Sequence, residues 1–181
     1  MKNILNIDDL QNMAKKRVPK MFYEYADSGS WSGETYKDNQ NDFSNIKFRQ
    51  RVGVNIENRT LSKSFLGKKV SIPLALAPTG LCGMQHYNGE IFAAQASEEF
   101  GIPFTLSTMS ICSIEDVAEA TTQPFWFQLY VMRDKVFISN LLSRAQAAGC
   151  SVLQITMDLN ILGQRHADVR NGLSAPPKFK L

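Results

Sequence analysis

Apolar and polar positions follow two different spacings along the chain, and the spacing changes near residue 70. Before that point apolar residues recur at helical spacing, which predicts three helices at residues 7–17, 19–25 and 34–43. Pro19 suits the first turn of the second helix because a proline lacks only an N–H that has no partner there. The pattern therefore predicts a mostly helical N-terminal segment over residues 1–70.

From residue 72 onward, short apolar runs alternate with longer amphipathic stretches. The runs predict four strands, at residues 73–78, 103–107, 125–130 and 152–156, and the first of them is expected to be buried. Helices are expected between them, at residues 89–100, after the capping residue Ser113, and at residues 134–148. The strands recur at intervals of roughly 20 to 30 residues, and each except the last is followed by a helix, which is typical of βαβ units.

This alternation indicates an α/β fold with a parallel sheet, either doubly wound or closed as a (β/α)8 TIM barrel. A complete barrel needs about 250 residues, and residues 71–181 have room for only about four βα units. We therefore expect the N-terminal half of a TIM barrel over residues 71–181, preceded by the helical segment 1–70. The half-barrel would be truncated at Leu181, in the loop after its fourth strand.

Composition narrows the class of protein without indicating its chemistry. Hydrophobic residues make up 44% and charged residues 20% of the chain, as in ordinary globular proteins, and a net charge of +3 does not indicate nucleic-acid binding. Cys82, Cys112 and Cys150 lack metal-ligand spacing, and their odd number without a signal peptide favours a reducing compartment. No segment approaches the roughly 18 apolar residues of a membrane span, so we expect a cytoplasmic protein without a metal.

Polar side chains collect where the expected strands end. Ser107, Gln128, Tyr130 and Thr156 stand at such ends, and Arg165 follows in the loop beyond the fourth strand. Because the carboxyl ends of parallel strands share one face, these residues could converge on a ligand, although any one of them could simply end a strand. The Gln128 amide suits the pyrimidine edge of a flavin, and Arg165 can grip a carboxylate with two hydrogen bonds. Neither a G-x-G-x-x-G nor a Walker A pattern is present, so the sequence does not support a Rossmann or P-loop site.

At these residues the chain resembles the FMN-dependent L-2-hydroxy acid dehydrogenases and oxidases, and among them most closely the bacterial respiratory L-lactate dehydrogenases. The matching segments run in the same order over nearly the whole chain, at residues 22–29, 76–84, 101–108, 126–131 and 156–172. The resemblance implies FMN as the cofactor and an L-2-hydroxy acid as the substrate. The expected reaction is the oxidation of L-lactate to pyruvate.

The resemblance also implies roles for individual residues. Contacts with FMN are implied for Ala77, Pro78, Thr79, Ser107, Gln128 and Thr156. Contacts with the substrate are implied for Tyr25, Tyr130 and Arg165, with Arg165 binding the carboxylate. Without the resemblance, Tyr25 would be interpreted as a buried helical tyrosine.

The resemblance places the rest of the catalytic machinery beyond Leu181. In this family a histidine of the second half of the barrel removes the hydroxyl proton, a lysine supports the reduced flavin, a second arginine helps to hold the substrate, and late loops hold the FMN phosphate. We do not expect His86 or His166 to replace that base. Asn160 stands where relatives usually carry proline, which predicts a less rigid loop before Arg165.

Three hypotheses follow for the function. In the first, the chain is one half of an FMN-dependent L-2-hydroxy acid dehydrogenase that is inactive alone, needs the missing C-terminal half and belongs to a family that is often homotetrameric. In the second, it is a catalytically inactive half-barrel that only binds flavin or a partner chain. The third, a different phosphate-using barrel enzyme, has no supporting motif.

Because relatives of the closest type work at the cytoplasmic face of the inner membrane, peripheral attachment there is the alternative to a freely cytoplasmic location.

Overall fold

The computed structural model describes residues 4–159 and 161–173, so the expected effect of Asn160 lies outside the described residues. The chain divides into two compact units. The first combines Met1–Asn55 with Ile161–Leu181, and the second is Ile56–Asn160. The expected division of the chain at residue 70 stays a prediction.

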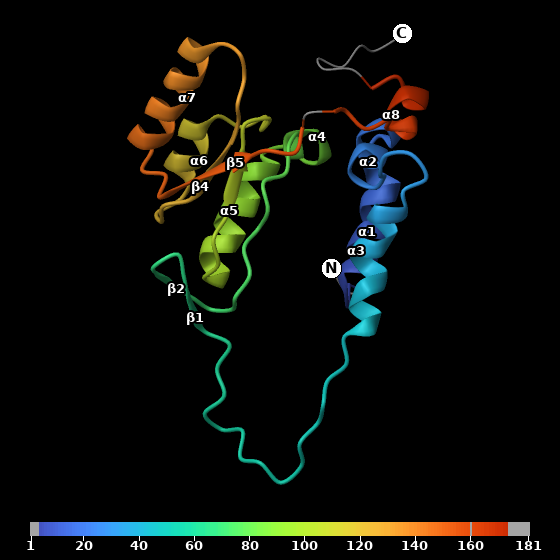
Figure 1. The fold of residues 1–181 in the computed structure, drawn as a ribbon, viewed down its shortest axis with the longest axis vertical. Coiled ribbons are helices and arrows are strands. Elements are labelled where there is room, and N and C mark those ends of the chain that lie inside the picture. Colours follow the sequence, from blue (N-terminus) through green and yellow to red (C-terminus); the bar gives the residue numbers. More distant parts are fainter. Residues whose placement is uncertain (1–3, 160, 174–181) are drawn as a thin grey trace. The chain divides into compact units, whose positions relative to one another are not determined.

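The first unit is helical. Its elements are α1 (Ile7–Arg17), α2 (Lys20–Ala26), α3 (Glu34–Asn41), the 3-10 helix η1 (Asp42–Asn45) and α8 (His166–Asn171) (Figure 1). The three helices expected before residue 45 are confirmed, and α1 begins at a capping box in which Asn6 and Asp9 exchange hydrogen bonds. The short helix α8 was not predicted, and it is tied to α2 because Asn171 Nδ2 donates to Glu24 Oε2 at 2.5 Å.

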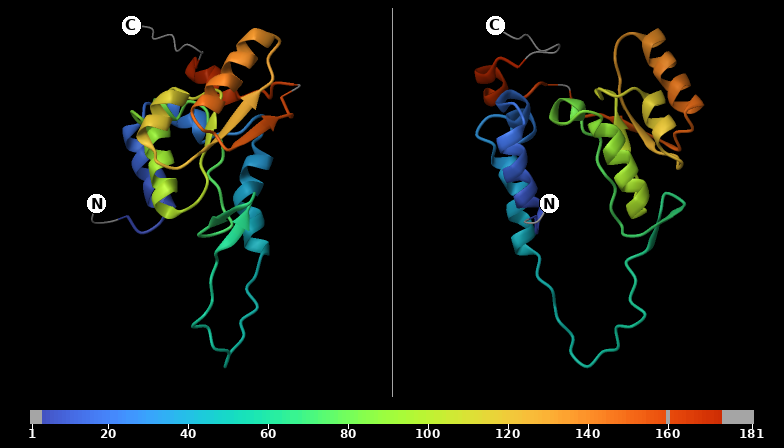
Figure 2. Two further views of the ribbon diagram at one scale, coloured as in Figure 1. Left: turned by 90° about the vertical axis from the view of Figure 1, so that its left-hand side faces the viewer. Right: turned by 180° about the vertical axis from the view of Figure 1, so that it is seen from behind.

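The expectation of a mostly helical segment is wrong for residues 46–70. Residues 46–62 contain no helix or strand (Figure 2), and a hairpin of β1 (Lys63–Phe65) and β2 (Lys68–Val70) follows them. Its two-residue turn has φ of 46° at Leu66 and 80° at Gly67. Turns with two positive φ values match the twist of antiparallel strands, but a leucine in the first position gives no sequence signal for such a turn.

A parallel sheet of three strands forms the centre of the second unit. The strands β3 (Thr105–Ser107), β4 (Trp126–Tyr130) and β5 (Val152–Thr156) lie in that order. The helices α5 (Gly89–Phe100), α6 (Ile114–Ala120) and α7 (Lys135–Ala147) cover one face of the sheet (Figure 1). The predicted α/β fold with a parallel sheet is confirmed, and the number of βα units in a complete barrel stays a prediction.

The first of the four expected strands is the exception. Residues 73–78 form only an isolated parallel bridge between Leu76 and Phe104, and Leu74 is 59% exposed, so the prediction of a buried strand is wrong there. Proline at positions 73 and 78 removes two backbone donors, which limits the ladder to a single bridge. The bridge still brings residues 77–79 to the end of the sheet where β3 finishes.

Alternation along the strands separates an apolar face from a polar one. The core between sheet and helices contains Leu106, Val117, Phe127, Leu129 and Leu141, together with Ala94. Because successive side chains of a strand point to opposite faces, the intervening residues Ser107, Gln128, Tyr130 and Thr156 project from the other face. The helices thus bury the apolar positions of β3 and β4, whereas Leu153 and Ile155 of β5 stay 45% and 49% exposed. The polar residues gather on the opposite face of the sheet.

Candidate functional site

A hydrogen-bonded amide lies at the centre of the polar face. Gln128 is 1% exposed, and its Oε1 accepts from Ser107 Oγ at 3.2 Å and from the backbone N–H of Thr108 at 3.3 Å. Its Nε2 donates to Thr156 Oγ1 at 2.7 Å. The register of the strands places these three side chains together, because Ser107 lies opposite Gln128 on β4, while Thr156 ends the next strand. The structure therefore brings together the three residues expected to hydrogen-bond the cofactor.

Thr108 extends this network, a contribution that the sequence did not single out. Its Oγ1 donates to the carbonyl oxygen of Gln128 at 2.6 Å and accepts from the N–H of Tyr130 at 3.2 Å. Ser107 Oγ in turn accepts from the N–H of Met109 at 3.1 Å. These bonds fix the backbone just past β3 against the end of β4, so the network is rigid before any ligand arrives.

The network leaves donors that fit the edge of a flavin. An amide nitrogen carries two hydrogens, and one of those on Gln128 goes to Thr156. Since Thr156 Oγ1 accepts that bond, its own hydrogen is available to a ligand. A planar ring system with alternating acceptors and a donor matches this set, and the chemistry of the donors therefore fits FMN.

Residues 77–79 lie at the same end of the sheet as Ser107. Ala77 and Thr79 are exposed and Pro78 is half-buried, so they offer an apolar surface of the kind that a flavin ring covers. At the neighbouring Gly80, an added Cβ would lie 3.1 Å from Met109 Cβ and 3.8 Å from Ser107 Oγ. The missing side chain lets the two loops approach each other beside the network.

Arg165 lies in the first unit, where an acidic residue orients its side chain. Its Nε donates to Asp168 Oδ2 at 2.5 Å, its Nη2 donates to the carbonyl oxygen of Tyr25, and its Cζ lies 4.9 Å from the centroid of the Tyr25 ring. A guanidinium has five N–H donors, so others stay available for an anion. Arg165 also lines a hollow of about 480 Å³ formed by residues 163–173.

The structure thus brings together two of the three residues expected to bind substrate, Tyr25 and Arg165. Tyr130 belongs to the other compact unit, and the expectation that it lies beside Tyr25 and Arg165 stays a prediction. Asp168, which contacts Arg165, is a candidate site residue that the sequence reasoning missed. Its spacing of three residues from Arg165, at the start of a short helix, is the signal that could have revealed it.

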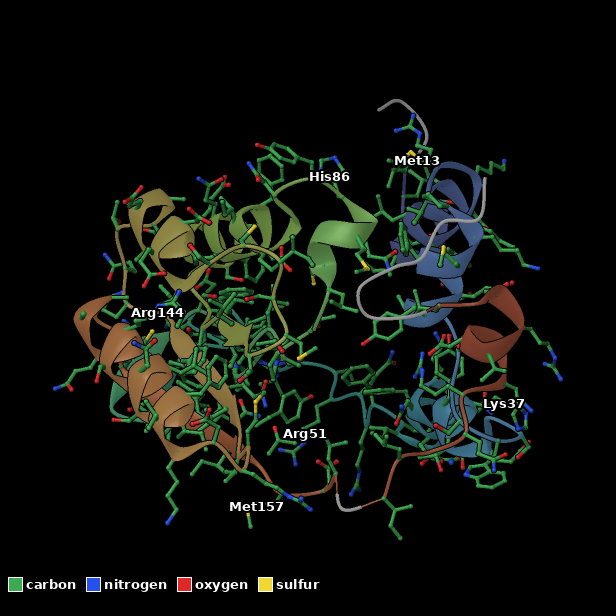
Figure 3. All side chains as sticks on the ribbon, turned by 90° about the horizontal axis from the view of Figure 1, so that it is seen from above. Met13, Lys37, Arg51, His86, Arg144 and Met157 are labelled. Atoms are coloured by element: carbon green, nitrogen blue, oxygen red, sulfur yellow. The ribbon has the colours of Figure 1, made fainter. Side chains whose placement is uncertain are left out.

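Both histidines make local contacts. His86 follows α4 (Cys82–Gln85), with Nδ1 2.7 Å from the carbonyl oxygen of Tyr87 and its ring 5.6 Å from that of Phe92 (Figure 3). His166 lies edge-on to Trp31, with 6.2 Å between the ring centroids. Loop packing accounts for both rings, and within residues 4–159 and 161–173 neither has a carboxylate partner that would orient it as a base.

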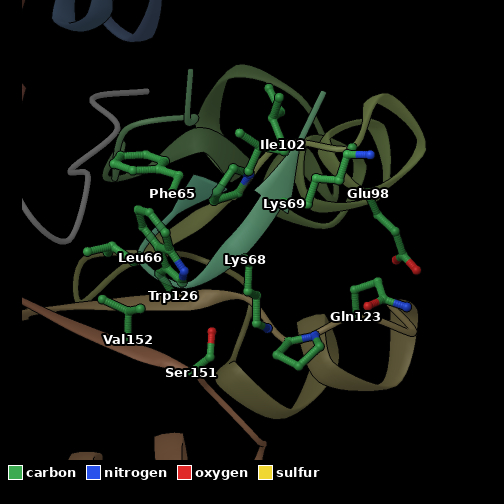
Figure 4. A pocket seen from close by; sticks show the side chains of 14 residues that line it. Phe65, Leu66, Lys68, Lys69, Glu98, Ile102, Gln123, Trp126, Ser151 and Val152 are labelled. Carbon is green, nitrogen blue, oxygen red and sulfur yellow. The ribbon is translucent and has the colours of Figure 1, made fainter. Parts of the chain in front are cut away.

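A cavity of about 510 Å³ lies at the end of the sheet where β4 and β5 begin, opposite the polar network. Figure 4 shows the residues that line it. Its walls come from the β1–β2 hairpin and the starts of β4 and β5, and Phe65 packs edge-on against Trp126 at 5.4 Å. In barrel enzymes, this amino-terminal end contributes stability, whereas the carboxyl end carries the chemistry. We therefore place the candidate site at the carboxyl ends of the strands.

The cysteines of the second unit are expected to be slow nucleophiles. Burial raises the pKa of Cys150 to about 11, and burial followed by the charge of Glu90 raises that of Cys82 to about 11. At neutral pH such thiols hold roughly a hundredth of the thiolate of an ordinary cysteine, or less. Labelling with iodoacetamide should be slow in the folded protein and fast in urea, as followed by mass spectrometry. Equal rates in both states for either cysteine would contradict this expectation.

Comparison with known proteins identifies the family of the chain. The FMN-dependent dehydrogenase family matches residues 14–181. The L-lactate dehydrogenase of Haemophilus influenzae strain Rd is 46% identical over 97% of this chain and 46% of its own length, and that of Ectopseudomonas mendocina is 46% identical over 93% and 44%. The structure of a soluble mutant of the membrane-associated (S)-mandelate dehydrogenase from Pseudomonas putida superposes with a TM-score of 0.90 at 36% identity, covering 97% of this chain and 50% of that one.

The chain belongs to the FMN-dependent dehydrogenase family. That family depends on FMN, and the relatives compared above are dehydrogenases of lactate and mandelate, both 2-hydroxy acids. The chain spans about half the length of the curated relatives that it matches. Among the described residues, no helix is both long and apolar enough to cross a bilayer.

Proposed function

We propose that this chain supplies the N-terminal half of a site for FMN-dependent oxidation of an L-2-hydroxy acid, with L-lactate converted to pyruvate. The observation that carries the proposal is the network that joins Ser107, Gln128 and Thr156 across three adjacent strands. A satisfied polar network holds its members in one arrangement, so the donors that it leaves over are already oriented for a ligand. The family match supports FMN as that ligand.

In this proposal the chain's own residues bind and orient. Gln128 and Thr156 hydrogen-bond the edge of the flavin, and residues 77–79 lie against its ring. Arg165 binds the carboxylate of the substrate, and the phenol groups of Tyr25 and Tyr130 contact the substrate beside it. Asp168 holds the guanidinium in place, as its 2.5 Å hydrogen bond to Nε supports.

The groups that carry out the redox step are not among the side chains of this chain. FMN, when bound, supplies the acceptor for the hydride equivalent of the hydroxy acid. The hydroxyl proton goes to a base that the family resemblance places outside residues 1–181. The chain therefore needs a C-terminal half, and the proposal includes the first half of a (β/α)8 barrel over residues 71–181, behind the segment 1–70.

Assembly and location belong to the same proposal. The family resemblance favours a homotetramer that works in the cytoplasm or attaches to the cytoplasmic face of the inner membrane. The membrane association stated for the (S)-mandelate dehydrogenase of Pseudomonas putida supports peripheral attachment.

Titration with FMN tests the proposal. Residues 1–181 are purified and titrated by quenching of flavin fluorescence, alone and together with a separately expressed C-terminal half of a close relative. We expect FMN binding and lactate-dependent bleaching of the flavin only when both halves are present. Binding without bleaching in the combined sample would favour the second hypothesis, a half-barrel that binds flavin without turnover. Absence of binding in both samples would refute the proposal.

A further inference from the structure

A buried carboxylate outside the polar network connects two loops of the second unit. Glu90 lies in the first turn of α5 and is 1% exposed. Its Oε1 accepts from the backbone N–H of Gly83 at 3.1 Å and from that of Ile111 at 2.9 Å. Gly83 belongs to α4 in the loop that follows residues 73–78, and Ile111 belongs to the loop that follows β3. One oxygen atom therefore bridges two loops that are separate in sequence.

The two loops also pack closely against each other. The N–H of Leu81 donates to the carbonyl oxygen of Met109 at 2.9 Å. At Gly83, an added Cβ would lie 2.6 Å from Ile111 Cβ, closer than side chains approach. The same loops carry Thr79 and Gly80 on one side and Met109, which donates to Ser107 Oγ, on the other. Their spacing thus sets the border of the proposed FMN site.

The charge of Glu90 makes the bridge strong. Burial favours the neutral acid, but the backbone N–H groups of Ile111, of Glu90 itself and of Gly83 outweigh it and lower the pKa of the carboxyl. The second oxygen, Oε2, is buried and has no hydrogen-bond partner among the described residues. Within those residues, no group of three His, Cys, Asp or Glu side chains could hold a metal ion there. A buried charge of this kind destabilises the folded state, and its hydrogen bonds to the two loops offset that destabilisation.

We propose that Glu90 is a positioning residue for the flavin site, which joins the loop containing Gly83 to the loop containing Ile111 and so fixes the gap that receives the ring. This inference rests on the proposed function and adds a residue that does not itself touch the cofactor. Hydrogen bonds to an ionised acceptor are about twice as strong as neutral ones, which explains why a carboxylate suits this place.

Three variants test the proposal. E90A removes the bridge, and E90Q keeps a neutral acceptor in its place. E98A is the matched control, because Glu98 is also on α5 and also accepts from a loop, at 3.1 and 3.3 Å from the N–H of Thr122. That contact lies at the other end of the helix, near the starts of the strands. E98A thus removes a similar helix-to-loop bond far from the proposed ring.

Two measurements are made on the full-length protein that contains residues 1–181. The first is the position of the Gly83 and Ile111 amide signals in ¹⁵N-labelled protein, which needs no cofactor. The second is the Kd for FMN. We expect E90A to shift both amide signals upfield and to raise the Kd roughly tenfold or more, E90Q to give intermediate changes, and E98A to leave both unchanged.

The outcomes separate positioning from a purely structural role. If Glu90 only stabilised α5, E90A would melt at a lower temperature but bind FMN as tightly as wild type, and the proposal would be overturned. If E90A does not fold, E90Q decides, because an unchanged Kd in E90Q overturns the proposal and a raised one supports it. If wild type binds no FMN, the proposed function fails, and the amide signals alone decide whether Glu90 joins the loops.

Discussion

Replacement of Arg165 with methionine is expected to lower kcat/KM for L-lactate roughly a hundredfold or more in the enzyme reconstituted from both halves. Methionine keeps the apolar length of the side chain but removes the cation that we propose binds the carboxylate. It also leaves Asp168, whose side chain is 15% exposed, without its ion-pair partner. Loss of one member of such a pair costs about 2–5 kcal/mol. Steady-state kinetics over a range of L-lactate concentrations measure the effect.

Two further variants show whether the geometry of Arg165 matters as well as its charge. R165K keeps the charge but cannot reproduce the two bonds to Asp168 and to the carbonyl oxygen of Tyr25, so we expect it to recover only part of the activity. R170M is the matched control, because Arg170 is on α8 and lines the same hollow. Equal losses in R165M and R170M would mean that the hollow is sensitive to charge in general, and the assignment of Arg165 would fail.

Replacement of Gln128 with leucine is expected to destabilise the second unit by about 2–4 kcal/mol and to weaken FMN binding roughly a hundredfold. Leucine fills the space but leaves Ser107 Oγ and Thr156 Oγ1 without the Gln128 amide as a partner. The N–H of Thr108 loses its bond to Oε1 but keeps its 3.1 Å bond to the backbone carbonyl oxygen of position 128. Buried polar groups that lose a partner cost about 1–3 kcal/mol each. Urea unfolding followed by circular dichroism measures the first effect, and flavin fluorescence measures the second.

Gln154 provides the control for this substitution. It lies opposite Gln128 in the register of β4 and β5, but it is exposed. We therefore expect Q154L to change the free energy of unfolding by less than about 0.5 kcal/mol and to leave the Kd for FMN unchanged. If Q128L were as stable as Q154L, the network would not hold the strand ends together as described.

The parts of the fold that the sequence predicted well carry strong local signals. The helices α1 and α5 and the strand β5 have the predicted bounds because each combines a clear period with a distinct start or stop. The β1–β2 hairpin was missed because Leu66 occupies a turn position where asparagine or glycine would give the signal. Residues 73–78 have the apolar content of a buried strand, and only the structure reveals that their pairing stops at one bridge.

For the candidate site, the residues involved were easier to predict than the hydrogen bonds that orient them. Polar residues at strand ends identified Ser107, Gln128 and Thr156, since parallel strands align their carboxyl ends. The orientation of Arg165 by Asp168 depends on a helix of six residues, too short to be recognised from periodicity. The Glu90 bridge depends on two backbone N–H groups, which leave no trace in the identity of any side chain.

The span of the polar network has a consequence for the order in which the protein folds. Gln128 is 21 residues from Ser107 and 28 from Thr156 along the chain, whereas the turns of the helices join residues only four apart. Contacts across such separations form after local ones because closing the intervening chain costs entropy. The network therefore completes only when β5 has docked beside β4. In a refolding experiment, affinity for flavin should appear after helical circular dichroism has already recovered, so that cofactor capture reports the last step of assembly.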